Sequence, residues 1–308
     1  MREVDGVEWD GLELDAYYRR PYVESAALLD GGRPFLLEHD GAVFAGLERD
    51  DPRDVVTPYG YGGPVGGGPG FWEAYEEWCR ERGAVSTFAR FHPLYANQAG
   101  APVHVEELAP TVGWRVERGR DLLAGLHWKH RNKVRKAENA GATVSAAYGL
   151  GEFVPLYEDT MRRVNASEFY FFAPAYWETL AGLGDGLLRF DASIDGGVVA
   201  SALCLASPPW LHYHLSGTTE AGRSTGSSTL VLLEAARWAQ GHGFERFHLG
   251  GGLGGKEDSL HHFKARFDPE GLVPAAVGKA IHDEEAYRRL SGGHLGLDGF
   301  FPAYRASR

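Results

Sequence analysis

Two glycine-rich loops, each leading into a helix, are the parts of the sequence whose residue types and spacing could bind a ligand. The second loop, 216–228, contains Arg223-x-x-Gly226-x-Ser228 and precedes apolar residues at helical spacing over 229–240. A helix that begins after glycines offers unpaired backbone N–H groups and the positive end of its dipole to an anion. Tight turns also require glycine, so one such loop leaves both an anion site and a plain turn open.

A short β-type run over 211–215 precedes the second loop and carries two histidines around a tyrosine. Strand alternation predicts that His212, His214 and Ser216 share one face and that Tyr213 lies on the other. His214 could serve as a general base or be an ordinary core histidine. The His-x-His pair has no third ligand at an obvious spacing, so the sequence predicts no metal site.

The first glycine loop, 60–70, begins beside two tyrosines. Tyr59 and Tyr61 could stack on a ligand, donate a hydrogen bond to it, or simply pack as a lid over the loop.

A basic helix is predicted over 122–140, with Asp121 as its N-cap and Gly141 at its end. Five cations fall within eight residues of it, and Arg131 and Arg135, four residues apart, share one face. Arginine forks match phosphate or carboxylate oxygens. The alternative is a solvated helix surface whose charges contribute little.

The same order of elements occurs twice along the chain. A strand at 55–59 is followed by loop 60–70, a helix at 71–82 and a strand at 85–91, and 211–249 repeats this order. Trp78 stands five residues before Gly83, as Trp238 does before Gly243, at an offset of 160. Any two strand–helix–strand units look alike, but a repeat near half the chain length favours a duplicated domain. The sequence therefore predicts two domains, 1–145 and 150–308.

The remaining pattern alternates strands and helices, which indicates a mixed α/β class. Strands are expected at 34–38, 43–47, 142–147, 187–194 and 198–206, helices at 152–165, 175–182 and 280–290, and a mixed stretch at 106–116.

Composition narrows the function classes. The net charge of −11 argues against broad nucleic-acid binding, so no DNA partner is expected. The longest apolar run, 198–211, is too short to cross a bilayer, and the acidic start of the chain is unlike a signal peptide. Cys79 and Cys204 are read as buried thiols of a reducing compartment, which predicts a cytoplasmic location without a membrane partner.

Four segments resemble the FemABX-type branch of the GNAT acyltransferase superfamily, whose members fuse two GNAT-like domains. They are Gly63-Pro-Val65 with Ala89–Pro93, the basic helix Lys129–Ala137, the strand Tyr213–Gly217, and Phe263-Lys264-Ala-Arg-Phe267. Together these short segments span most of the chain, from about residue 35 to 275, and their order and spacing make the match more specific than any single segment.

This resemblance implies an enzyme that moves an aminoacyl group from a charged tRNA to an amine on a peptide-like, cell-wall-precursor-like or phosphate-bearing acceptor, without a cofactor. Aminolysis needs a neutral amine and a stabilised oxyanion. The resemblance assigns the second need to the Phe263 N–H and the Lys264 cation. It also implies that the acceptor is bound by the loop tyrosines, the basic helix and the central strand, at Tyr59, Tyr61, Lys129, Arg131, Asn132, Arg135, Tyr213 and Ser216.

The chain departs from that family in two features. It has no coiled-coil insertion, and its Arg223-x-x-Gly226 spacing resembles the pyrophosphate loop of acyl-CoA-dependent GNAT enzymes. An acyl-CoA-dependent N-acyltransferase, with acyl-CoA as co-substrate held by Arg223 and Gly226, is therefore one alternative. A non-catalytic double-GNAT module that binds a ligand is another.

Overall fold

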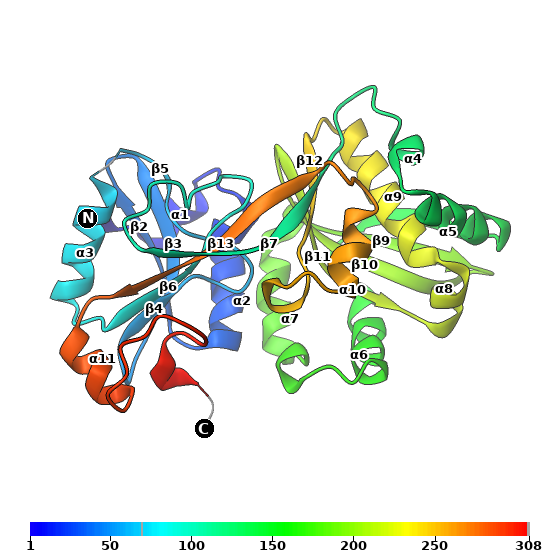
Figure 1. Ribbon diagram of the computed structural model, residues 1–308. Coiled ribbons are helices and arrows are strands. Elements are labelled where there is room, and N and C mark those ends of the chain that lie inside the picture. The colour runs from blue at the N-terminus through cyan, green and yellow to red at the C-terminus, as the bar shows by residue number, and fades with distance from the viewer. Residues whose placement is uncertain (69, 307–308) are drawn as a thin grey trace. The chain divides into compact units, whose positions relative to one another are not determined.

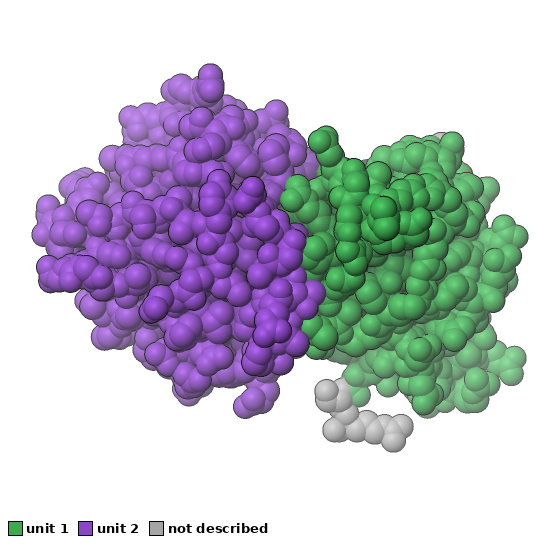
Figure 2. All heavy atoms as spheres, turned by 180° about the vertical axis from the view of Figure 1, so that it is seen from behind, with its two compact units in different colours: residues 1–108, 274–308 green, residues 109–273 purple. Residues whose placement is uncertain are grey.

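The computed structural model describes residues 1–68 and 70–306, so Pro69 of the first glycine loop and the last two residues of the second predicted domain lie outside it. The chain divides into two compact units, residues 1–108 with 274–308 and residues 109–273 (Figure 2). No helix within the described ranges is long and apolar enough to cross a membrane.

Unit 1 is built on a sheet in the order β1-β2-β3-β4-β6-β13, with β5 paired to β3 (Figure 1). Its strands are β1 (Arg2–Glu3), β2 (Arg33–His39), β3 (Ala42–Arg49), β4 (Asp54–Val56), β5 (Val65–Gly66), β6 (Ser86–Arg90) and most of β13 (Leu272–Ile281). Its helices are α1 (Gly6–Asp10), α2 (Arg20–Asp30), α3 (Phe71–Glu81) and α11 (Glu284–Leu290).

Unit 2 is built on a sheet in the order β7-β12-β11-β10-β9-β8. Its strands are β7 (His104–Arg115, which enters the unit at 109), β8 (Thr143–Tyr148), β9 (Leu187–Ile194), β10 (Gly197–Ser207), β11 (Trp210–Thr218) and β12 (Arg246–Gly250). Its helices are α4 (Leu122–Gly125), α5 (Trp128–Asn139), α6 (Phe153–Arg163), α7 (Pro174–Leu180), α8 (Glu220–Thr225), α9 (Ser227–Gly241) and α10 (Ser259–Ala265).

The two units share one topology, as the sequence repeat predicts. In each unit, several antiparallel strands are followed by one parallel pair. That pair is β4 with β6 in unit 1, connected through α3, and β11 with β12 in unit 2, connected through α9. The helices α3 and α9 both end before a glycine with positive φ, Gly83 and Gly243. The amides of Ala84 and Phe244 then bond carbonyls five residues back, at Cys79 and Ala239. This glycine cap satisfies end carbonyls that the helix leaves unpaired.

The units are divided differently from the predicted spans 1–145 and 150–308. Residues 112–115 of β7 pair with β12, and residues 277–281 of β13 pair with β6. Each unit thus takes an antiparallel strand from the other half of the chain. The segment 109–145, which the prediction placed in the first domain, therefore belongs to unit 2.

Three local expectations are wrong. The mixed stretch 106–116 is the strand β7, and the helix expected from residue 280 begins only at Glu284, because 272–281 form β13. The expected helix 122–140 is two helices, because Leu126 and His127 are extended and the His127 amide donates to the Arg266 carbonyl at 2.9 Å. Asp121 does cap the first of them, accepting from the Ala124 amide.

The core of unit 2 lies between the sheet and helices α4, α5 and α9. Nearly all of β10 is buried, because α9 packs against it and α6 also contacts it and β11. In unit 1, aromatic side chains of α3, among them Tyr75 and Trp78, pack against Phe35 and Phe44 of β2 and β3.

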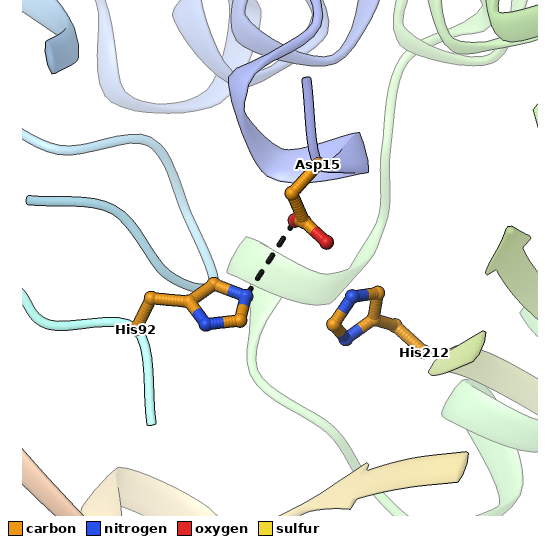
Figure 3. A group of neighbouring side chains, drawn as sticks. All are labelled: Asp15, His92 and His212. Carbon is orange, nitrogen blue, oxygen red and sulfur yellow. Dashed lines mark ion pairs between the residues drawn. The ribbon is translucent and has the colours of Figure 1, made fainter. Parts of the chain in front are cut away.

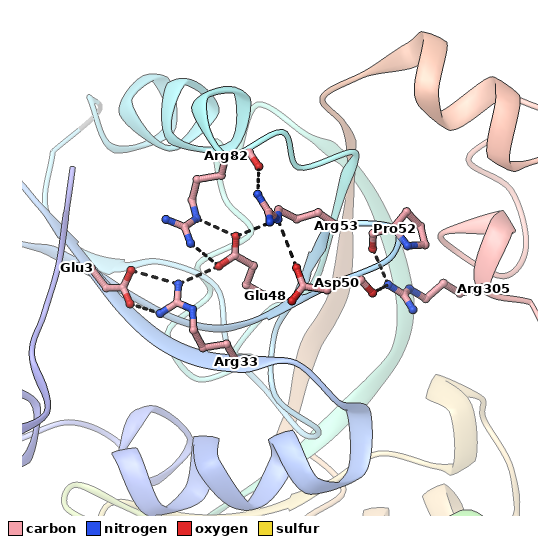
Figure 4. Close-up of polar contacts among 8 residues, drawn as sticks. All are labelled: Glu3, Arg33, Glu48, Asp50, Pro52, Arg53, Arg82 and Arg305. Atoms are coloured by element: carbon pink, nitrogen blue, oxygen red, sulfur yellow. Dashed lines mark hydrogen bonds and ion pairs between the residues drawn. The ribbon is translucent and has the colours of Figure 1, made fainter.

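An ion-pair cluster surrounds Glu48 near the C-terminal end of β3 in unit 1 (Figure 4). The Glu48 carboxylate, with a side chain only 6% exposed, accepts hydrogen bonds from Arg82 at 2.6 and 2.7 Å and from Arg33 at 2.8 Å. Burial by itself would raise the pKa of Glu48, but these hydrogen bonds outweigh it and lower the pKa to about 2. Glu48 is therefore held ionised by its partners.

Candidate active site in the second unit

A cavity of ≈ 260 Å³ lies in unit 2, where β10, β11, the junction of α8 with α9, α5 and α10 meet. It is lined by Lys133, Ser201, Ala202, Tyr213, Ser216, Gly222, Arg223, Gly226, Ser228, Thr229, Val231, Leu232, Leu260 and Phe263. Predicted site residues from three separate stretches thus meet at one cavity: Tyr213 and Ser216, Arg223 and Gly226, and Phe263.

A bulge in β11 orients the strand toward this cavity. Leu203 of β10 pairs with Leu215, but the next residue, Cys204, pairs with Tyr213, so His214 is the extra residue. Tyr213 and Ser216 both line the cavity, and the Tyr213 hydroxyl donates to the Ser216 hydroxyl at 2.5 Å. The predicted alternation, with Tyr213 opposite Ser216, is wrong because the bulge interrupts the two-residue period.

The strands β11 and β12 separate next to this bulge. Their parallel pairing ends at His212 and His248, and β11 continues to Thr218 beside β10. Parting strands leave backbone groups that a ligand can reach, which is a common place for a binding site in α/β sheets.

The N-terminus of α9 forms another wall. Gly226 precedes it with φ +84°, and a Cβ at this position would come within 3.0 Å of the Lys133 Cβ. Glycine is therefore required by backbone conformation and by close packing of α5. Among the described side chains none caps α9; the Thr229 amide donates to the Gly226 carbonyl at 2.9 Å, and Ser228 and Thr229 of the first turn line the cavity.

Arg223 lies in the last turn of α8 and is largely exposed, with its guanidinium 3.3 Å from the Glu220 carboxylate. Lys133, from α5, lies across the cavity, and its ammonium is 5.4 Å from the centre of the Phe263 ring. Two cations and a helix N-terminus therefore border one small cavity, an arrangement that suits an anionic or strongly polar group.

Lys264 lies behind the cavity wall. Its side chain is buried, its ammonium donates to the Gly251 carbonyl at 2.7 Å, and it lies 5.6 Å from the centre of the Tyr213 ring. Burial lowers the pKa of Lys264 to about 8, partly offset by the Asp258 carboxylate. A desolvated cation held by one carbonyl retains capacity to interact with a second oxygen.

Phe263 contributes its ring to the cavity, but its amide lies inside α10, where helix amides donate to carbonyls one turn earlier. The Phe263 carbonyl, in turn, lies within hydrogen-bond distance of His130 Nε2, at 2.9 Å. His130 is fully buried on α5 and burial lowers its pKa to about 4, so it is a neutral link between α5 and α10.

The other predicted residues of the basic helix lie outside the cavity lining. Arg131 donates to the carbonyls of Ala124 and Leu126 and so caps the end of α4. Lys129, Asn132 and Arg135 are exposed on α5. The cations of α5 therefore have three different surroundings. Arg131 bonds the end of α4, Lys133 lines the cavity, and Lys129 and Arg135 face solvent.

His214 does not line the cavity. Its Nε2 is 2.9 Å from the Tyr176 hydroxyl, and burial, with a smaller effect of nearby His212, lowers its pKa to about 3. An imidazole with so low a pKa is neutral near pH 7 but accepts a proton only weakly.

Tyr59 and Tyr61 belong to unit 1. The Tyr59 carbonyl accepts from the Tyr22 hydroxyl at 2.6 Å. The Tyr61 ring packs edge-on against Tyr17 and His92, and burial raises its pKa. His92 in turn lies 3.5 Å from the Asp15 carboxylate (Figure 3), so Tyr61 is part of a packed aromatic and ionic group within unit 1.

Sequence reasoning missed Lys133, Ser201 and His130 as residues of this region. A signal existed for His130, because His130, Val134 and Ala137 recur at helical spacing and are the buried stripe of α5. Ser201 could not be singled out, because its place in the lining, with its hydroxyl donating to Asp191 of β9, depends on the folded sheet.

Comparison with known proteins supports the fold assignment. Residues 127–264 match the family model described as an acetyltransferase (GNAT) domain. No curated protein sequence matches the chain significantly.

Three solved structures resemble most of the chain at low identity. FemX is 15% identical with a TM-score of 0.69, covering 94% of this chain and 99% of its own. L-PGS from Bacillus licheniformis is 12% identical with a TM-score of 0.59, covering 85% and 88%. A tandem GNAT protein from the clavulanic acid biosynthesis pathway is 12% identical with a TM-score of 0.50, covering 87% and 97%. The predicted class, α/β with two fused GNAT-like domains, is confirmed.

Proposed function

We propose that this protein is an acyltransferase that forms an amide bond, moving an aminoacyl group from a charged tRNA to an amine of a peptide-like or cell-wall-precursor-like acceptor. The observation that carries the proposal is the cavity of unit 2, where Tyr213, Ser216 and Phe263 meet the N-terminus of α9, with Lys264 directly behind Tyr213. The match of residues 127–264 to a GNAT domain covers every residue of this group.

The size of the cavity fits the reacting end of the donor. At ≈ 260 Å³ it is smaller than the roughly 300–1,000 Å³ typical of pockets that enclose whole drug-sized ligands. It has room for one amino acid or a short acyl chain, while a nucleotide carrier would extend outside.

The reaction requires the amine nitrogen to attack the ester carbonyl carbon as a neutral group. The new C–N bond creates a tetrahedral oxyanion, which collapses as the C–O bond to the tRNA ribose breaks and the proton lost by the amine passes to the leaving oxygen. We assign oxyanion stabilisation to the Lys264 ammonium, which lies outside the cavity lining and 5.6 Å from the centre of the Tyr213 ring, because a buried cation interacts strongly with charge that develops nearby. The ring of Phe263 and the pair Tyr213–Ser216 shape the acyl site.

The acceptor is assigned to the exposed face of α5. Lys129, Asn132 and Arg135 present two cations and an amide to solvent, which suits a phosphate or carboxylate. Arg131→Ala should instead weaken the fold, because its guanidinium caps α4. We expect Arg135→Ala to raise the acceptor KM and leave kcat unchanged, as loss of uniform binding does.

One observation favours acyl-CoA as the donor in place of charged tRNA. Arg223, Gly226 and Ser228 line the same cavity at the start of a 15-residue helix, where a pyrophosphate could be bound by backbone amides and the arginine. A non-catalytic binding module would also need the cavity, but it would not need the buried Lys264 ammonium, so this lysine favours an enzyme.

The deciding experiment compares transfer from charged tRNA with transfer from acetyl-CoA, using Lys264→Met and Arg223→Ala variants. With charged tRNA as donor, Lys264→Met should lower kcat by about 10²–10³, as expected for loss of one oxyanion donor, and Arg223→Ala should have little effect. Glu220→Ala, which removes only the partner of Arg223, is the matched control for α8.

Other outcomes would select the alternatives. A large rise in the acetyl-CoA KM in Arg223→Ala, with no transfer from any charged tRNA, would establish the thioester donor. Binding of either donor without transfer to any amine would favour the non-catalytic module. Wild-type activity in Lys264→Met would remove this lysine from the mechanism.

A further inference from the structure

The first turn of α10 contains a buried histidine whose ring has no role in the proposed reaction. His261 is 3% exposed, and within the described part of the chain neither of its ring nitrogens has a hydrogen-bond partner. Leaving a buried polar nitrogen unpaired is costly, because its hydrogen bonds to water are lost and not replaced. Such a group in a native fold needs an explanation, and a bound ion is one that the neighbouring side chains can be tested against.

Two further metal-binding side chains lie beside His261. One ligand atom each from Glu257, His261 and His262 lie within 4.8 Å of one another, and His262 Nδ1 is 3.8 Å from a Glu257 oxygen. The rings of His261 and His262 have centres 5.8 Å apart. Two imidazoles and one carboxylate thus lie close enough to share one ion.

We propose that Glu257, His261 and His262 bind a divalent transition-metal ion of the zinc class. Two histidines and one glutamate are a known zinc ligand set, which leaves a fourth position for water or another ligand. Imidazole nitrogens select zinc-like ions over magnesium and calcium, which take oxygen ligands.

The geometry requires only a small adjustment of the site. Ligand atoms at 2.0–2.1 Å from a tetrahedral ion are about 3.4 Å apart. The ligand atoms now lie within 4.8 Å of one another, with His262 Nδ1 3.8 Å from a Glu257 oxygen, and they reach the required spacing if the exposed side chains of Glu257 and His262 turn inward.

The surrounding backbone already holds the ligands together. The Asp258 carboxylate accepts from the His261 amide at 2.8 Å and from the Leu253 amide at 3.1 Å. It therefore ties the loop that carries Glu257 to the start of α10. A bound ion would reinforce this tie, and it would satisfy a nitrogen of His261.

This site differs from the sequence-based expectation of no metal. That expectation considered the His-x-His pair of β11, whereas these ligands come from a loop and the helix turn after it, where only the folded loop brings Glu257 to His261.

The test is titration of the metal-free protein, with any polyhistidine tag removed, by Zn²⁺ in a calorimeter and by Co²⁺ followed by visible absorption. We expect one ion per chain and the intense visible bands of four-coordinate Co²⁺. Glu257→Gln and His262→Gln, both at exposed positions, should each weaken binding by roughly tenfold or more while the circular dichroism spectrum stays unchanged.

His294→Gln, at another exposed histidine, is the matched control and should leave the affinity unchanged. Absence of stoichiometric Zn²⁺ binding would overturn the proposal. So would equal binding by wild type, His262→Gln and Glu257→Gln. His261→Asn, which tests the buried ligand, should abolish the Co²⁺ bands in a folded protein.

Discussion

Glu48 should make unit 1 sensitive to acid, and Glu48→Gln should remove much of that sensitivity. The folded-state pKa is about 2, against an ordinary value of 4.5. A carboxylate whose pKa is lowered in the folded state stabilises it above the unfolded pKa, and that stabilisation is lost as the pH falls through the folded value. The relevant window therefore runs from about pH 4.5 down to about pH 2.

The magnitude follows from the pKa difference. Lowering the pKa from 4.5 to about 2, at about 1.36 kcal/mol for each tenfold change in the proton equilibrium, gives an upper value of about 3.4 kcal/mol. The side chains of Arg33 and Arg82 are 44% and 35% exposed, so water screens their attraction. We therefore expect Glu48→Gln to lower the free energy of unfolding by about 2 kcal/mol at pH 7 and by much less at pH 3.

The assay is urea unfolding followed by tryptophan fluorescence at pH 7, 5 and 3, with unit 1 fitted separately wherever two transitions are resolved. Trp78 reports on this region, because the Arg82 guanidinium lies 5.1 Å from its ring centre. Glu77→Gln, at an exposed position of α3, is the control and should change little. A loss below about 0.5 kcal/mol at pH 7, or the same loss at pH 3, would refute the reasoning.

Three further predictions concern packing. Leu233→Ala, at a fully buried position of α9, should lower the free energy of unfolding by about 2–5 kcal/mol in chemical denaturation. Gly226→Ala should lower the melting temperature, because its φ is +84° and Lys133 crowds the Cβ, whereas Gly241→Ala, with open space around it, should not. Burial raises the pKa of the thiols of Cys79, to about 12, and Cys204, so neither should react with a thiol reagent until the protein is unfolded in urea.

The sequence by itself determined the local features that depend on neighbours along the chain. The α/β class, the helices α3 and α9, and their ends at Gly83 and Gly243 follow from apolar spacing and from the conformational freedom of glycine. The strand–helix–strand repeat predicted a shared topology, which the parallel pairs of both units confirm. These signals need no knowledge of distant residues.

The tertiary structure decided which strand completes which sheet. Residues 112–115 of β7 pair with β12, and residues 277–281 of β13 pair with β6, in each case with a strand more than 100 residues away. Strand propensity is set largely by packing against neighbours, so the pattern at 272–281 did not identify a strand and part of it was assigned to a helix. The boundaries of the units follow from these long-range pairings.

The site depends on the fold in the same way. The sequence selected Tyr213, Ser216 and Phe263, but the bulge at His214 decides that Tyr213 and Ser216 share one side. A bulge is a property of two paired strands, so one strand's alternation could not reveal it. Likewise Arg131 and Lys133 are equivalent cations in the sequence, and only the folded chain gives one to the α4 carbonyls and the other to the cavity.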